Sequence, residues 1–112
     1  MGNRNTERRH HERHDLACPV EIHDSEGRLL ARTRTVNISD GGALLSVPVD
    51  QAGSLDGQVS LDLRVPRTTP NTYMLEKFST RARILRNQPI VEKGFAGLAL
   101  QFFEPVKLEL KV

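Results

Sequence analysis

The residues best suited to binding chemistry form two short patterns in the first half of the chain. Arg9 and Arg13 make an R-x-x-x-R pattern, and a further arginine, Arg8, directly precedes it. Asn37–Gly42 reads NISDGG, an N-x-S-x-x-G pattern. A guanidinium group offers paired N–H donors that match the oxygens of a phosphate or the O6/N7 edge of guanine. Two arginines four positions apart can therefore close over one planar, anionic ligand.

The second pattern offers donors and acceptors of another kind. The Asn37 side chain can address the N1/N2 edge of guanine, and the Ser39 hydroxyl can bond a phosphate or hold the turn. Gly42 permits either a left-handed backbone or a close approach to a ligand. The same composition is common in ordinary turns, where Asn and Ser bond their own backbone. Ligand binding and simple turn formation therefore both remain open for this segment. We expect Arg13 and Ser39 to lie outside the core.

No pattern typical of an enzyme accompanies these residues. The chain has four histidines but no zinc-protease motif, and its one cysteine, Cys18, excludes an internal disulfide or a cysteine-based zinc site. Neither a nucleophile elbow around Ser39 nor a glycine-rich phosphate loop is present. We expect no catalysis, no metal and no cofactor. The cysteine usage fits a reducing, cytoplasmic location.

Charge is concentrated at the N-terminus. The net charge is +2, and residues 1–14 hold four arginines and two glutamates, so the rest of the chain is neutral. Residues 1–15 lack apolar periodicity and are predicted to be a flexible basic arm, although charge runs are as often simple solvated termini. A neutral body without aromatic residues before Tyr73 argues against a DNA or RNA partner. No signal peptide or membrane span is expected.

The arm precedes one small all-β domain, predicted over residues 16–112. Apolar alternation predicts six strands, at 16–23, 28–36, 43–47, 59–65, 74–86 and 95–103. The segments between them, including 37–42, 50–57, 66–71 and 87–94, are expected to be turns or loops. A mostly antiparallel closed barrel is favoured because it leaves no free sheet edges. The tail, residues 105–112, also alternates and is predicted to be a strand that pairs with the barrel edge or with a second subunit. We expect a core of aliphatic side chains together with the five aromatic ones: Tyr73, Phe78, Phe95, Phe102 and Phe103.

In their order and spacing, the two patterns resemble those of the PilZ domain family, the bacterial receptors for cyclic di-GMP. Members of that family carry R-x-x-x-R before the first strand and [D/N]-x-S-x-x-G between the second and third strands. Many end on an apolar strand of the form G-x-x-x-x-F, which Gly97–Phe102 matches here. The resemblance spans residues 7–103. It implies a six-stranded antiparallel split β-barrel, in agreement with the strands predicted above.

The resemblance also implies roles for the individual residues. Arg9 and Arg13 would grip guanine and phosphate, Asn37 would recognise guanine, and Ser39 would contact the ligand or fix the turn. Gly42 would let the backbone pass close to the ligand. Two departures from the family pattern affect the site: Glu12 adds a negative charge inside the arginine motif, and Asn37 stands where Asp is commoner. A strand-like tail, where the family often has a helix, affects the C-terminal packing.

The implied function is a sensor module. Binding of cyclic di-GMP would order the arm against the barrel and signal to an effector protein. Because Arg8 adds a third arginine to the arm, we predict two ligand molecules per chain, with Arg8 holding the outer one. The alternative is an adaptor of the same fold that binds proteins and no nucleotide. A homodimer through the tail is a further possibility.

Overall fold

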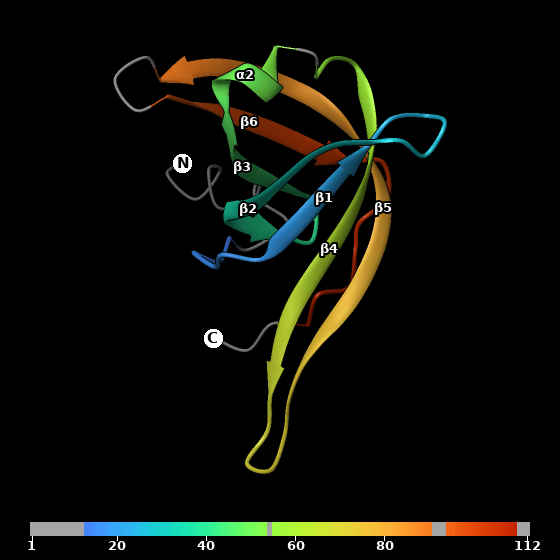
Figure 1. The fold of residues 1–112 in the computed structure, drawn as a ribbon. Coiled ribbons are helices and arrows are strands. Elements are labelled where there is room, and N and C mark those ends of the chain that lie inside the picture. The colour runs from blue at the N-terminus through green and yellow to red at the C-terminus, as the bar shows by residue number, and fades with distance from the viewer. Residues whose placement is uncertain (1–12, 54, 91–93, 110–112) are drawn as a thin grey trace, which may run out of the picture.

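The apolar alternation of the sequence corresponds to a series of strands with tight connections (Figure 1). The computed structural model describes residues 13–53, 55–90 and 94–109. The elements along the chain are β1 (Pro19–His23), β2 (Leu29–Ser39), β3 (Gly42–Pro48), α2 (Val49–Ala52), β4 (Gln58–Thr68), β5 (Tyr73–Ile90) and β6 (Phe95–Phe102). The short α2 overlaps residues 50–57, a segment expected to be a loop. No helix among the described residues is long and apolar enough to cross a membrane.

The six strands form a closed barrel in the order β1-β2-β3-β6-β5-β4. Each neighbouring pair is antiparallel, and β1 closes the barrel by pairing with both β2 and β4. The predicted six-stranded antiparallel barrel is therefore confirmed. Closure gives most strands a partner on each side, which satisfies the backbone N–H and C=O groups.

Aliphatic side chains fill the barrel. In β4 the alternate residues Val59, Leu61, Leu63 and Val65 point inward and are at most 4% exposed. The expectation that all the aromatic residues join them is wrong, because Tyr73, Phe95 and Phe103 are 65%, 42% and 36% exposed. Tyr73 and Phe95 lie at the ends of strands, beyond the packed interior. The Phe103 ring is covered instead by the guanidinium groups of Arg81 and Arg83, at 5.4 and 5.7 Å.

Two strands run further than the sequence indicates. The expected break at residues 66–71 is confined to the turn, because β4 continues through Pro66 to Thr68 and β5 starts at Tyr73. Residues 64–77 thus form a two-stranded ribbon that extends away from the barrel, here called the projecting hairpin (Figure 1). Pro66 is tolerated because this part of β4 has a strand partner on one side only. At its other end β5 continues to Ile90, so the turn predicted from Asn87 onward is also too long.

The prediction of a strand in the tail is wrong for its described part. Residues 105–109 pair with no strand. Leu108 is 1% exposed and joins the barrel core, with Val106 packed against it. Of the alternating apolar residues, Leu108 is thus buried and Val106 partly buried by irregular backbone and not by a ladder. Residues 110–112 lie outside the described residues.

Candidate ligand-binding site

The two sequence patterns meet at one place on the surface. The Arg13 side chain donates from Nη1 to Oδ1 of Asn37 at 3.0 Å, across 24 positions of sequence. The backbone beside them pairs as well: the His14 N–H donates to the Ile38 carbonyl at 2.8 Å, and the Ile38 N–H donates to the His14 carbonyl at 2.9 Å. The structure therefore brings Arg13 and Asn37 together as the motif spacing implies. Arg8 and Arg9 lie outside the described residues.

A β-bulge determines where Asn37 points. The register of β2 against β3 passes from Thr35↔Leu45 to Asn37↔Leu44, so Val36 is an extra residue in β2. Strict alternation from the buried Thr35 would place Asn37 inside the barrel. The bulge instead turns Ile38 inward, fully buried, and leaves Asn37 only half-buried. The sequence carries no clear signal for this bulge.

Ser39 has a structural position. Its side chain is buried, so the expectation that it lies outside the core is wrong. The Ser39 hydroxyl accepts a hydrogen bond from the Gly41 N–H at 3.2 Å and donates to the Gly42 carbonyl at 3.4 Å. Of the two roles left open by the sequence, the structure shows the turn-holding one. The turn is also shorter than predicted, because β2 ends at Ser39 and β3 begins at Gly42.

Gly42 is required by a close approach of the protein's own backbone. Its φ lies outside the left-handed region, so conformational freedom is not the reason for glycine here. A Cβ atom at this position would stand 2.3 Å from the carbonyl oxygen of Leu100 on β6. The close passage expected at Gly42 therefore exists, and the group it approaches is the neighbouring strand.

The same turn also anchors the tail. The Asp40 carbonyl accepts a hydrogen bond from the Val106 N–H at 2.8 Å, and its carboxylate accepts one from the Leu108 N–H at 3.2 Å. The Gly41 carbonyl accepts from the Phe102 N–H at 2.9 Å. The motif turn is thus bonded to the end of β6 and to the tail, a connection that no sequence pattern indicated.

Beside Arg13 lies an open depression of about 780 Å³. It is lined by residues 13–16 before β1, residues 66–69 of the projecting hairpin, and Glu109. Arg67 lies there, with Nε bonded to the Glu76 carboxylate at 2.8 Å. Its two terminal nitrogens donate to the carbonyls of Leu108 and Glu109. Two arginines at one depression favour an anionic ligand, while the carboxylates of Asp15 and Glu109 oppose it.

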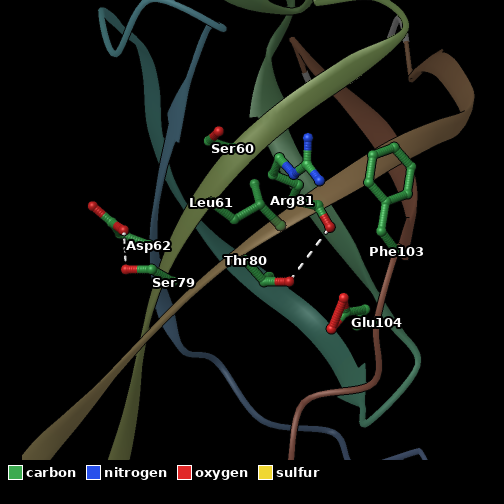
Figure 2. Close-up of a pocket in the computed structure, with 8 residues that line it drawn as sticks. All are labelled: Ser60, Leu61, Asp62, Ser79, Thr80, Arg81, Phe103 and Glu104. Carbon is green, nitrogen blue, oxygen red and sulfur yellow. Dashed lines mark hydrogen bonds between the residues drawn. The ribbon is translucent and has the colours of Figure 1, made fainter.

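A second hollow, of about 380 Å³, is lined by none of the motif residues. Figure 2 shows the side chains that line it. Its lining comes from β4, β5 and the two residues after β6: Ser60, Leu61, Asp62, Ser79, Thr80, Arg81, Phe103 and Glu104. The Ser79 hydroxyl donates to the Asp62 carboxylate at 2.8 Å. The hollow is lined by a single arginine, Arg81, so it offers no arginine pair comparable to the one beside Arg13 and Asn37.

One titratable cluster was missed at the sequence level. Glu21, His23 and Asp62 lie on β1 and β4, with donor atoms within 4.8 Å of one another. The two ring nitrogens of His23 face different carboxylates, at 3.7 Å from Glu21 and 4.0 Å from Asp62. Because the two ring nitrogens face separate carboxylates, the geometry suits pairing with each carboxylate better than chelation of one metal ion. Cross-strand pairing of β1 with β4 creates this cluster, which linear spacing does not show.

Comparisons with known proteins agree with this geometry. The sequence model of the family described as "PilZ domain" matches residues 7–111. Among solved structures, the inhibitor of motility MotI/DgrA from Bacillus subtilis matches with a TM-score of 0.66 and 23% sequence identity. The match covers 90% of this chain and 45% of that one, so the chain spans less than half the length of the motility inhibitor. No curated protein gives a significant match.

Proposed function

Because the chain belongs to the PilZ domain family, a family of cyclic di-GMP receptors, we propose that it binds cyclic di-GMP where Arg13 meets Asn37. The observation that carries the proposal is the 3.0 Å hydrogen bond between these two side chains. It joins the two halves of the family's ligand motif at an exposed site. A guanidinium and an amide placed together offer donors for phosphate and an acceptor for the N–H groups of guanine.

Ligand binding draws the N-terminal arm onto the barrel. Arg8 and Arg9 precede Arg13 in the sequence and bring two more guanidinium groups to the same ligand. Ordering the arm costs about 1 kcal/mol per residue. Several charge-assisted hydrogen bonds of about 1.5–3 kcal/mol each offset that cost. We expect a net affinity in the micromolar range, about −8 kcal/mol.

Arg8 sets the number of ligands in this proposal. Two arginines satisfy one guanine edge and one phosphate, and a third projects differently along the arm. Cyclic di-GMP can stack on itself as an intercalated dimer, and Arg8 holds the outer molecule of such a pair. Two molecules then bind per chain.

The output of this binding passes to another protein. The chain acts as a binding module in the cytoplasm, neither catalysing a reaction nor binding DNA or RNA, and an effector protein recognises the closed arm or the surface that it covers. The alternative, an adaptor of the same fold that binds no nucleotide, is disfavoured by the presence of Arg9, Arg13, Asn37 and Ser39 together.

Calorimetric titration tests the proposal directly. Cyclic di-GMP should bind with micromolar affinity near two per chain, and a single-stranded oligonucleotide should not bind. Arg8→Leu should reduce the stoichiometry toward one, whereas Arg32→Ala, which removes an exposed arginine of β2, should change nothing. Absence of any cyclic di-GMP binding would favour the adaptor. Saturation of the unaltered chain at one ligand would remove Arg8 from its role.

A further inference from the structure

The projecting hairpin leaves one strand edge without a partner. β5 pairs with β6 only from Ala82 to Ile90, although its pairing with β4 starts at Tyr73. The described part of the chain therefore puts no strand beside the first nine residues of β5, 73–81. Figure 1 shows this stretch extending away from the barrel with β4 on one side only.

Two hydrogen bonds show which backbone groups face that edge. The Arg81 carbonyl accepts from the Phe103 N–H at 3.0 Å, on the β6 side, while the Ile84 N–H donates to the Gly57 carbonyl at 2.8 Å, on the β4 side. Backbone groups alternate in direction along a strand. The N–H and C=O groups at the odd positions 73, 75, 77 and 79 therefore point outward, away from β4.

This edge carries charged side chains at Glu76, Lys77 and Arg81 but lacks the backbone devices that prevent pairing. Residues 73–81 contain no proline and no glycine, and their register with β4 has no bulge. Three consecutive large apolar residues on it are exposed: Tyr73 at 65%, Met74 at 56% and Leu75 at 41%. An open, regular edge with apolar side chains is a template for another strand.

We propose that the occupant is a second copy of this chain, bound by antiparallel pairing of the two β5 edges with Leu75 on the two-fold axis. In this register Leu75 faces its own equivalent, and Tyr73 faces Lys77 of the second copy. The Lys77 ammonium then lies beside a tyrosine ring, a favourable cation–π arrangement. On the other face Met74 meets Glu76 of the second copy, so no like charges stand opposite each other.

The neighbouring two-fold registers are worse. An axis at Glu76 sets two carboxylates opposite each other, and an axis at Lys77 sets two ammonium groups opposite each other. An axis at Phe78 brings Met74 of the second copy against Ala82, whose free side is already taken by Phe102 of β6. An axis at Met74 pairs fewer residues of β5 than an axis at Leu75 does. The complementarity of residues 73–77 with themselves is what selects a second copy as the partner.

Oligomeric state gives the first test, with cyclic di-GMP left out so that the result does not depend on the proposed function. Light scattering across a concentration series should show the mass rising from 12.6 kDa toward twice that value. Leu75→Lys puts two ammonium groups at the axis. It should raise the concentration at which half of the chains are dimeric at least tenfold. Leu85→Lys is the matched control, because Leu85 is 56% exposed on the same strand but lies where β5 has β6 beside it. A mass that stays monomeric, or equal effects of both variants, would overturn the proposal.

A cross-link gives a positive test that does not depend on loss of assembly. Residues paired across an antiparallel ladder have Cα atoms about 5.5 Å apart, within the range that a disulfide spans. Leu75→Cys should therefore oxidise to a covalent dimer, whereas Leu85→Cys should stay monomeric. The native Cys18 is fully buried and does not compete. Cross-linking of both variants to the same extent, or of neither, would contradict pairing at Leu75.

Discussion

The two halves of the ligand motif are held by the molecule in different ways. The turn half, Ser39–Gly42, is part of the barrel: Ser39 is buried, and Gly42 touches the backbone of β6. The arm half, at Arg13, is exposed and tied by one side-chain hydrogen bond to Asn37. One motif therefore combines a buried scaffold with an exposed contact. Substitutions in the two halves should therefore separate stability from binding.

The Gly42→Ala substitution should have the largest effect. The added methyl would stand 2.3 Å from the Leu100 carbonyl oxygen, which belongs to the backbone and cannot move aside alone. We expect a loss of about 3 kcal/mol in the free energy of unfolding, typical of overpacking. Urea denaturation followed by circular dichroism measures it.

The matched control is Gly53→Ala. A Cβ at Gly53 meets no atom within 4 Å, and its φ of −63° suits any residue. Gly53→Ala should change the free energy of unfolding by no more than about 0.5 kcal/mol. If Gly42→Ala proves equally mild, β3 and β6 can separate at this point, and the turn half is less rigid than the contact implies.

Much of this scaffold could be predicted from the sequence, because its signals are local. Alternation in residues 59–65 identified β4, and the N-x-S-x-x-G spacing located the turn. The bulge at Val36 could not be predicted, since it arises from the register of β2 against β3. The tail was mistaken for a strand because burial of Leu108 by packing gives the same alternation as a ladder. Arg67 was missed because a tertiary contact, not sequence spacing, brings it to the tail.

Ser39→Ala should reduce both the stability of the fold and the affinity for cyclic di-GMP. It removes the acceptor of the Gly41 N–H and the donor to the Gly42 carbonyl in a buried turn. We expect a loss of about 2 kcal/mol in the free energy of unfolding, within the range for an unsatisfied buried group. Cyclic di-GMP affinity should fall at least tenfold, about 1.4 kcal/mol, because the turn that carries the motif loosens.

The control for Ser39→Ala is an exposed serine in another turn. Ser25→Ala, in the hairpin between β1 and β2, should leave both stability and affinity unchanged. A Ser39→Ala chain that keeps its stability and loses only affinity would instead assign the hydroxyl to the ligand.

Arg13→Ala should reduce the affinity for cyclic di-GMP while leaving the stability of the fold almost unchanged. The side chain is exposed and bonds to Asn37 at the surface, so the free energy of unfolding should change by less than about 0.5 kcal/mol. Affinity for cyclic di-GMP should drop at least tenfold, about 1.4 kcal/mol. Unaltered affinity in this variant, measured beside Arg32→Ala, would remove Arg13 from the site.

Amide exchange should reveal the smallest difference, at the boundary between the two halves. The N–H groups of His14 and Ile38 are bonded to each other's carbonyls at 2.8 and 2.9 Å, so both should be protected before ligand is added. On addition of cyclic di-GMP, amides in residues 1–12 should gain protection by a larger factor than His14, because arm closure forms contacts there while the bridge already exists. Hydrogen exchange measures the free energy of local opening at each residue, and so the protection of each amide can be compared. Equal exchange of residues 1–12 with and without ligand would contradict arm closure. A His14 amide that gains as much protection as its N-terminal neighbours would place the hinge between residue 14 and the start of β1, and make the bridge to Ile38 part of the arm half.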